Sequence, residues 1–119
     1  MNDYRDLAVW QKAMDLVMEV YKIIRRLPKE ELYALTEQLR RAVVSIPSNI
    51  AEGYGRGATK DYCRFLSIAR GSKYEVETQL LICVRLGYVG KDEVVSAMSL
   101  CDEIGKMLNS IIIKLMPNA

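Results

Sequence analysis

The amino-acid sequence predicts an all-α fold: a single domain over residues 1–119 that forms an antiparallel up-down-up-down four-helix bundle. Four segments carry apolar residues at the helical spacing of three and four, and none alternates apolar and polar residues as a half-buried strand does. The breaks between these segments are short, which favours antiparallel neighbours. With 119 residues, half of them hydrophobic, the chain can bury a core without disulfides or a structural metal.

The first helix is predicted over residues 6–27, because Pro28 stops it. Its apolar residues form two adjacent seams that cover an arc of about 200°. That arc is wider than one helix of an isolated bundle needs. We therefore expect part of it to be buried against other copies of the chain, in a homo-oligomer. The seams comprise Leu7, Trp10, Met14, Val17, Tyr21 and Ile24, and Val9, Ala13, Leu16, Val20, Ile23 and Leu27.

The second helix is predicted from Lys29 or Glu30 to Gly53. Pro47 lies inside this segment, and we expect it to kink the helix or unwind it locally, because proline lacks an N–H and crowds the preceding turn. The glycine-rich residues 53–58 are expected to reverse the chain.

Thr59 is the expected N-cap of the third helix, which extends to about Leu86. Gly87 is the expected cap at its C-terminal end. The acidic pair at residues 92 and 93 suits the positive end of a helix dipole, so the fourth helix is predicted from there to about Met116.

An unbroken stripe of polar residues follows one face of the second helix, because its members are three or four residues apart. The structural interpretation pairs Arg41, and also Arg64, with acidic residues of the two helices, while hydroxyl and amide groups fix the helix register. This predicted polar seam consists of Gln38, Arg41, Ser45, Asn49, Glu52, Ser72 and Glu75.

Positive charge is concentrated in the middle of the chain. The net charge is only +2, but residues 40–73 contain seven basic side chains against two acidic ones, Glu52 and Asp61. The functional interpretation is a surface that contacts nucleic-acid phosphates, and the alternative is an ordinary solvated helix face. The predicted nucleic-acid-binding residues are Arg40, Arg56, Lys60, Arg64, Arg70 and Lys73.

The residue types present argue against an enzyme. The chain contains no histidine, which removes the usual general base and the commonest metal ligand, so we expect no metal and no cofactor. The Gly-Tyr-Gly-Arg-Gly run at residues 53–57 follows a helix and lacks the spacing of a phosphate-binding loop. The remaining catalytic alternative is an acid–base cluster of Arg41, Glu52 and Glu75.

The cysteines and the hydropathy pattern indicate a cytoplasmic protein. Cys63, Cys83 and Cys101 are odd in number and widely spaced, which suits reduced thiols. The N-terminal residues are polar and form no leader, and no stretch is long and apolar enough for a membrane span, so no membrane partner is expected.

Four separated motifs, at residues 7–14, 35–42, 45–53 and 65–75, give the sequence a family resemblance. Together they resemble the four-helix-bundle proteins encoded in intervening sequences of bacterial 23S ribosomal RNA genes. The resemblance implies a left-handed antiparallel bundle, commonly a homopentamer, with no known catalytic activity. The family signature falls on Trp10, Gln38, Arg41, Ser45, Pro47, Asn49, Glu52, Gly53, Arg56, Phe65, Ala69, Gly71, Ser72 and Glu75.

The resemblance extends in fold to the accessory variability protein of diversity-generating retroelements, a positively charged pentameric barrel that binds nucleic acid and a reverse transcriptase. The present chain has a more modest net charge than that protein. The leading hypothesis is a non-catalytic oligomeric bundle that binds structured RNA or DNA through residues 40–73, linked to ribosomal RNA intervening sequences or a mobile element. The alternative is a protein-binding scaffold that recruits a partner enzyme such as a reverse transcriptase.

Overall fold

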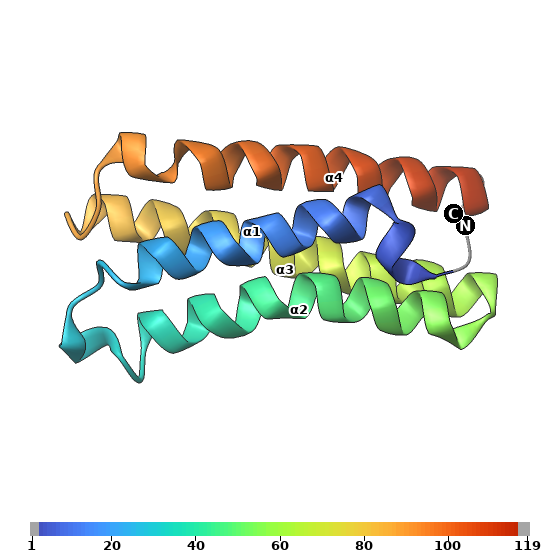
Figure 1. Cartoon of the computed structure of the whole chain (residues 1–119), viewed down its shortest axis with the longest axis horizontal. Helices are drawn as coiled ribbons and strands as arrows, with labels where there is room; N and C mark the ends of the chain where they lie inside the picture. Colours follow the sequence, from blue (N-terminus) through green and yellow to red (C-terminus); the bar gives the residue numbers. More distant parts are fainter. Residues whose placement is uncertain (1–2, 117–119) are drawn as a thin grey trace.

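The computed structural model describes residues 3–116 and contains four α-helices, with no strand among those residues (Figure 1). Three short 3-10 helices precede α1, α2 and α4, so each of these helices starts later than the apolar pattern predicted. The elements are η1 (Tyr4–Asp6), α1 (Ala8–Ile24), η2 (Lys29–Glu31), α2 (Leu35–Arg56), α3 (Thr59–Arg85), η3 (Lys91–Val94) and α4 (Val95–Leu115).

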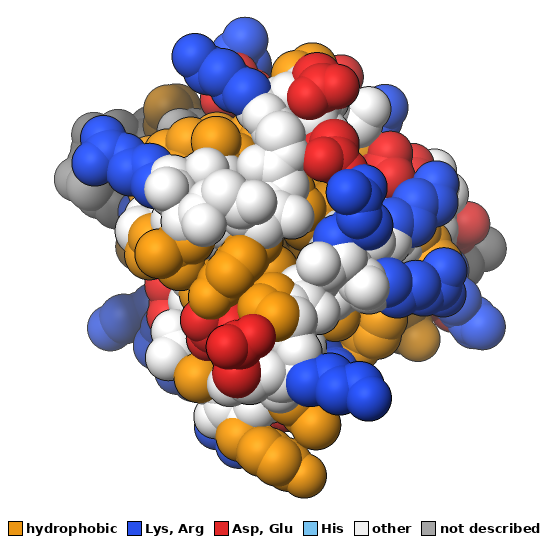
Figure 2. Space-filling model, turned by 90° about the vertical axis from the view of Figure 1, so that its left-hand side faces the viewer, with side chains coloured by type: hydrophobic (Ala, Val, Ile, Leu, Met, Phe, Trp, Pro, Cys, Tyr) orange, Lys and Arg blue, Asp and Glu red, His pale blue; other side chains and the backbone are white. Residues whose placement is uncertain are grey.

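The four helices pack side by side into an elongated body of 43 × 23 × 22 Å. Each helix packs on the next one along the chain, and α1 packs on α4. The α1–α2 and α3–α4 connections lie at one end of the body, and the α2–α3 turn lies at the other (Figure 1). Figure 2 views the first of these ends, where acidic and basic side chains both lie at the surface. The prediction of an all-α, four-helix protein is confirmed.

A single core of aliphatic side chains runs between the helices. Each fully buried Leu or Ile contributes about 1.5–3 kcal/mol relative to exposure. The three cysteines are free and buried, as predicted, and behave as small apolar core residues. The largest fully buried residues include Leu16, Leu39, Ile46, Ile50, Leu66, Leu80, Ile104 and Leu108.

The α2–α3 turn is shorter than the sequence predicted. Helix α2 continues through residues 53–56, and only Gly57 and Ala58 separate it from α3. Gly57 has φ of +83°, a left-handed conformation that glycine adopts without steric cost. The prediction that Thr59 is the N-cap is wrong: Ala58 occupies that position, without a side-chain hydrogen bond, and Thr59 is the first helical residue.

Pro47 does not interrupt α2. The helix runs without a break from Leu35 to Arg56, so the predicted local unwinding does not occur. The Pro47 ring is buried, and its burial offsets the lost backbone hydrogen bond.

Two caps near the α1–α2 end hold neighbouring segments together. Glu31 accepts the Leu35 N–H at 3.3 Å and, through its other oxygen, the Tyr88 hydroxyl at 2.7 Å. Gly87 has φ of +78°, with its N–H bonded to the Val84 carbonyl and the Tyr88 N–H to the Cys83 carbonyl. This is the glycine-terminated helix end predicted for α3.

Candidate nucleic-acid interface

The α2 and α3 helices form the face on which the sequence placed both the polar seam and the basic surface. They approach each other closely at the turn end, where a Cβ added to Gly53 would lie 2.6 Å from the Phe65 Cβ. Only glycine permits this approach. The register set there places the polar stripes of the two helices along a shared seam.

Three members of the predicted polar seam, Ser45, Asn49 and Ser72, are hydrogen-bonded to one another. The Ser45 and Ser72 hydroxyls meet across the two helices at 2.8 Å. Asn49 Nδ2 donates to both the Ser45 carbonyl and the Ser45 hydroxyl, at 2.8 Å each. The Ser45–Ser72 bond joins α2 to α3, and Asn49 supports it from within α2, which agrees with a role in fixing register.

The predicted ion pairs across the helices do not form. Arg41 Nε lies 3.2 Å from Glu37 Oε1, and Glu52 pairs with Arg56 at 3.0 Å, so both pairs stay within α2. Arg64 pairs within α3, with Asp61 at 3.6 Å. Helical neighbours three or four residues apart meet more readily than groups on separate helices.

The acid–base cluster considered from the sequence is also absent from the described residues. Arg41, Glu52 and Glu75 are all exposed, and the Arg41 side chain keeps 81% of its surface accessible. No two of them are bonded to one another. Groups so placed and solvated lack the desolvation that tunes a catalytic acid or base.

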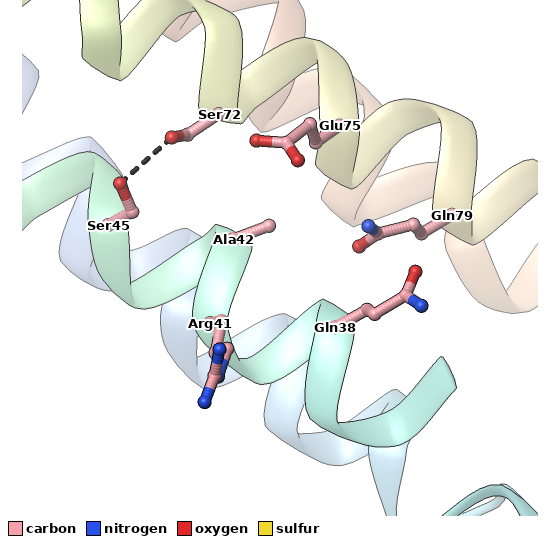
Figure 3. A pocket seen from close by; sticks show the side chains of 7 residues that line it. All are labelled: Gln38, Arg41, Ala42, Ser45, Ser72, Glu75 and Gln79. Carbon is pink, nitrogen blue, oxygen red and sulfur yellow. Dashed lines mark hydrogen bonds between the residues drawn. The ribbon is translucent and has the colours of Figure 1, made fainter. Parts of the chain in front are cut away.

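The seam opens into a groove of about 370 Å³ in the part of the α2–α3 face away from the turn (Figure 3). Gln79, which the sequence analysis did not single out, lies in this groove and is buried. Its position one turn after Glu75, on the same face of α3, is the sequence feature that could have identified it as part of the seam. The lining residues are Gln38, Arg41, Ala42, Ser45, Ser72, Glu75 and Gln79.

Two arginines near the α2–α3 turn come together over one aromatic ring. The guanidinium carbon of Arg56 lies 5.1 Å from the centre of the Phe65 ring, and that of Arg64 lies 4.5 Å from it. Arg56 comes from α2 and Arg64 from α3. Lys60, one turn before Arg64, is exposed. We call Arg56, Lys60 and Arg64 the turn cluster.

The other three predicted phosphate-contacting residues lie elsewhere. Arg40, which pairs with Glu37 at 2.8 Å, is on the second turn of α2, far along the helix from the turn cluster. Arg70 donates to Asn109 Oδ1 of α4 at 2.8 Å. The prediction that Lys73 is a surface residue is wrong, since it is only 5% exposed.

Lys73 is buried between α3 and α4 because its neighbour there is a glycine. A Cβ added to Gly105 would lie 3.1 Å from both Lys73 Cε and Nζ. The ammonium group lies 3.3 Å from Glu77 Oε2 and 3.8 Å from the centre of the Tyr74 ring. An ion pair and a cation–π contact thus compensate its burial.

Aromatic residues adjoin the turn cluster. Tyr54 and Tyr62 meet edge to face, with ring centres 5.9 Å apart, beside a hollow of about 160 Å³ that Leu115 also lines. Burial raises the pKa of the Tyr62 hydroxyl, and the neighbouring Tyr54 adds to this shift. Cations and aromatic rings in one place are the combination that binds nucleic acid by charge and stacking.

No group of three potential ligands among the described residues could hold a metal ion. Within residues 3–116, none of the helices has the length and apolar character required to cross a bilayer.

These features define a four-helix-bundle protein with an open polar face on two adjacent helices. Residues 5–110 match the sequence model of the family described as 23S rRNA-intervening sequence protein. The chain belongs to this family, as the four motifs predicted.

A solved structure has the same fold. It is the crystal structure of a protein of unknown function from the S23 ribosomal protein family of Bacteroides thetaiotaomicron VPI-5482. The two chains are 25% identical, with a TM-score of 0.81, and the match covers 88% of this chain and 98% of that one. None of the curated proteins compared with this chain matches it.

Proposed function

We propose that this protein is a non-catalytic cytoplasmic bundle that binds structured RNA or DNA through the turn cluster. The family's description links it to ribosomal RNA intervening sequences, and a duplex or folded RNA is the ligand class in keeping with that link. In this proposal Arg56, Lys60 and Arg64 contact phosphates, and Tyr54 offers a ring for an unpaired base.

One observation carries the proposal: two guanidinium groups from different helices lie over the same Phe65 ring, next to an exposed lysine. The carboxylates paired with these arginines neutralise little of their positive charge. Glu52 and Asp61 are both substantially exposed, with 54% and 44% of their side-chain surface accessible. A phosphate can therefore displace these exposed carboxylates, since exposed ion pairs contribute only about 0–1 kcal/mol.

Fluorescence anisotropy of a labelled RNA hairpin and of a matched DNA duplex tests the proposal. We expect saturable binding whose affinity falls steeply as salt rises, with a log–log slope of about −0.9 for each neutralised duplex phosphate. Absence of binding at low salt would contradict the proposal.

Charge reversal separates specific contacts from general attraction. The triple variant Arg56→Glu, Lys60→Glu, Arg64→Glu is expected to abolish binding. A control with the same change in net charge, Lys29→Glu, Arg85→Glu, Lys91→Glu, alters exposed residues near the opposite end of the bundle and should retain most of it. Equal losses in both variants would show that net charge alone drives the interaction.

We further propose that the antiparallel bundle assembles as a homo-oligomer through α1, with a pentamer expected from the family. Met14 and Met18 support this, because both long apolar side chains of α1 are exposed on the isolated chain. Ring assembly would repeat the turn cluster around an axis and multiply its field.

The alternative function is a scaffold that recruits a partner protein, such as a reverse transcriptase. It is favoured by the exposed groove of the α2–α3 face, which lies apart from the turn cluster. Reversing the charges of the turn cluster should leave partner capture intact if the scaffold function is correct.

A further inference from the structure

We propose that the groove between α2 and α3 receives an arginine side chain presented by a protein partner. This groove of about 370 Å³ adjoins a second hollow of about 330 Å³, and the two share Gln38, Glu75 and Gln79. This inference does not depend on nucleic-acid binding, because none of its residues belongs to the turn cluster.

Gln79 supplies the first observation. Its side chain is only 9% exposed, yet Oε1 is buried without a hydrogen-bond partner among the described residues. Buried polar atoms are nearly always satisfied, and a donor is what this oxygen lacks. Figure 3 shows the Gln79 amide directed into the groove, with the exposed Gln38 side chain reaching toward it from α2.

Glu75 supplies the second observation. It lies one helical turn before Gln79 on the same face of α3 and also lines the groove. Glu37, Glu52 and Glu77 each pair with a basic residue of their own helix, whereas Glu75 has no ion pair within the described chain. A free carboxylate and a free carbonyl thus line the same groove as acceptors.

This set of acceptors selects a planar cation. The guanidinium group offers five N–H donors in a fixed fork, which can reach two acceptors on one face at once. Phosphate is excluded, because Glu75 would repel it. Arg41, the one cation of the groove lining, bonds to Glu37 and points away from Glu75 and Gln79 (Figure 3).

The adjoining hollow suits the rest of an arginine side chain. Tyr74 and Ile82 line it beside Thr78, and both are exposed large hydrophobic residues. The three methylene groups of arginine would cover Ile82, and the guanidinium plane can stack near the Tyr74 ring. A site with polar acceptors next to apolar surface therefore suits the amphipathic arginine side chain better than it suits the compact ammonium group of lysine.

The test is a titration of the full-length, ¹⁵N-labelled protein with Nα-acetyl-L-arginine amide, followed through the Gln79 side-chain NH₂ resonances. We expect saturable shifts with a dissociation constant of roughly 1–10 mM, as for a small ligand held by a few contacts. The uncharged isostere Nα-acetyl-L-citrulline amide should give none. No saturable shift, or equal shifts with both compounds, would overturn the proposal.

Substitutions localise the effect. Glu75→Gln and Gln79→Met should each weaken binding about tenfold, the latter followed through the side-chain NH₂ resonances of Gln38, which also lines the groove, while the control Glu52→Gln, an exposed acid outside the groove, should not change it. Glu75 is exposed, so its variant keeps the fold even if the Gln79 variant does not. Unchanged affinity in Glu75→Gln would overturn the assignment.

The same spectra separate this proposal from nucleic-acid binding. Addition of an RNA hairpin should shift resonances of the turn cluster and leave those of Gln79 in place. If RNA shifts Gln79 in the same way and competes with the arginine amide, the groove is part of a nucleic-acid site and the proposal fails.

Discussion

Gly53 of α2 and Phe65 of α3 lie so close together that a Cβ on Gly53 would stand 2.6 Å from the Cβ of Phe65. Tyr62 closes the same space, with its ring edge 3.2 Å from that position. The contact holds the two helices together at the turn end, where the Arg56 and Arg64 side chains cover the Phe65 ring.

Gly53→Ala is therefore expected to destabilise the protein. Overpacking costs about 1–3 kcal/mol, and the better helix propensity of alanine returns about 1 kcal/mol, which leaves a net loss of about 0–2 kcal/mol. Thermal unfolding followed by circular dichroism measures this. The matched control is Gly71→Ala in α3, which has open space around its Cβ and should gain roughly 0.5–1 kcal/mol. A stabilising Gly53→Ala would mean that the helices can separate freely.

The buried Lys73–Glu77 pair predicts an asymmetric response to mutation. Glu77→Leu leaves the 7%-exposed Lys73 side chain charged and unpaired, and should cost about 3–5 kcal/mol. Lys73→Met should cost less, because Glu77 keeps 18% of its side-chain surface in contact with water. In urea titrations the double variant should be more stable than Glu77→Leu alone, and strictly additive losses would contradict this coupling.

Two buried thiols predict a loss of stability in alkali. Burial raises the pKa of Cys83 to about 11 and that of Cys101 to about 12, from the ordinary thiol value of 9.0. The stabilising effect is fully present below pH 9, where the thiols of the unfolded chain stay protonated, and is lost as the pH rises toward 12.

Urea unfolding at a series of pH values checks this. The free energy of unfolding should decline above pH 9 in the wild type, and the decline should be shallower in the double variant Cys83→Ala, Cys101→Ala. Parallel declines in the two proteins would assign the alkaline loss to other groups.

Glu31 links the start of α2 to the segment after α3 through its two oxygens. Glu31→Ala should therefore cost about 1–2 kcal/mol, and Tyr88→Phe, which removes only one of the two bonds, should cost less. Glu30→Ala, at the exposed neighbouring residue, is the control and should lie within about 0.5 kcal/mol of the wild type. Equal effects of Glu30→Ala and Glu31→Ala would show that charge near the helix start, rather than these bonds, matters.

The oligomer proposed above predicts a concentration-dependent sedimentation coefficient. Met18 is 58% exposed, so Met18→Glu should dissociate the assembly while leaving the helical circular dichroism spectrum unchanged. Ser96→Glu, at an exposed polar residue of α4, serves as the control. A wild-type protein that sediments as a monomer at micromolar concentration would refute the proposal.

The helices were predictable because their apolar spacing is a local property of the sequence. Their boundaries near residue 53 were not, since the same glycines permit a loop or a helix, and here packing of Gly53 on Phe65 extends α2 to Arg56. The three cysteines were predicted to be reduced and apolar, and all three are free and buried.

The candidate surface was predictable only in part, because partner choice depends on three-dimensional neighbours. The Ser45–Ser72 bond joins stripes that the sequence had already placed on facing helices. Lys73 was misassigned because nothing local reveals that Gly105, 32 positions later, leaves space for its ammonium group. The arginines of the stripe pair within their own helices, where acids one turn away are nearest.

The cross-section of the bundle, 23 × 22 Å, determines the footprint of one chain bound end-on through its turn cluster. With a rise of about 3.4 Å per base pair in B-form DNA, one copy would occlude only about 7 base pairs. The rest of its 43 Å length would project away from the duplex. Neighbouring copies could thus array along a short stretch of nucleic acid while their α2–α3 grooves stay accessible to a second macromolecule.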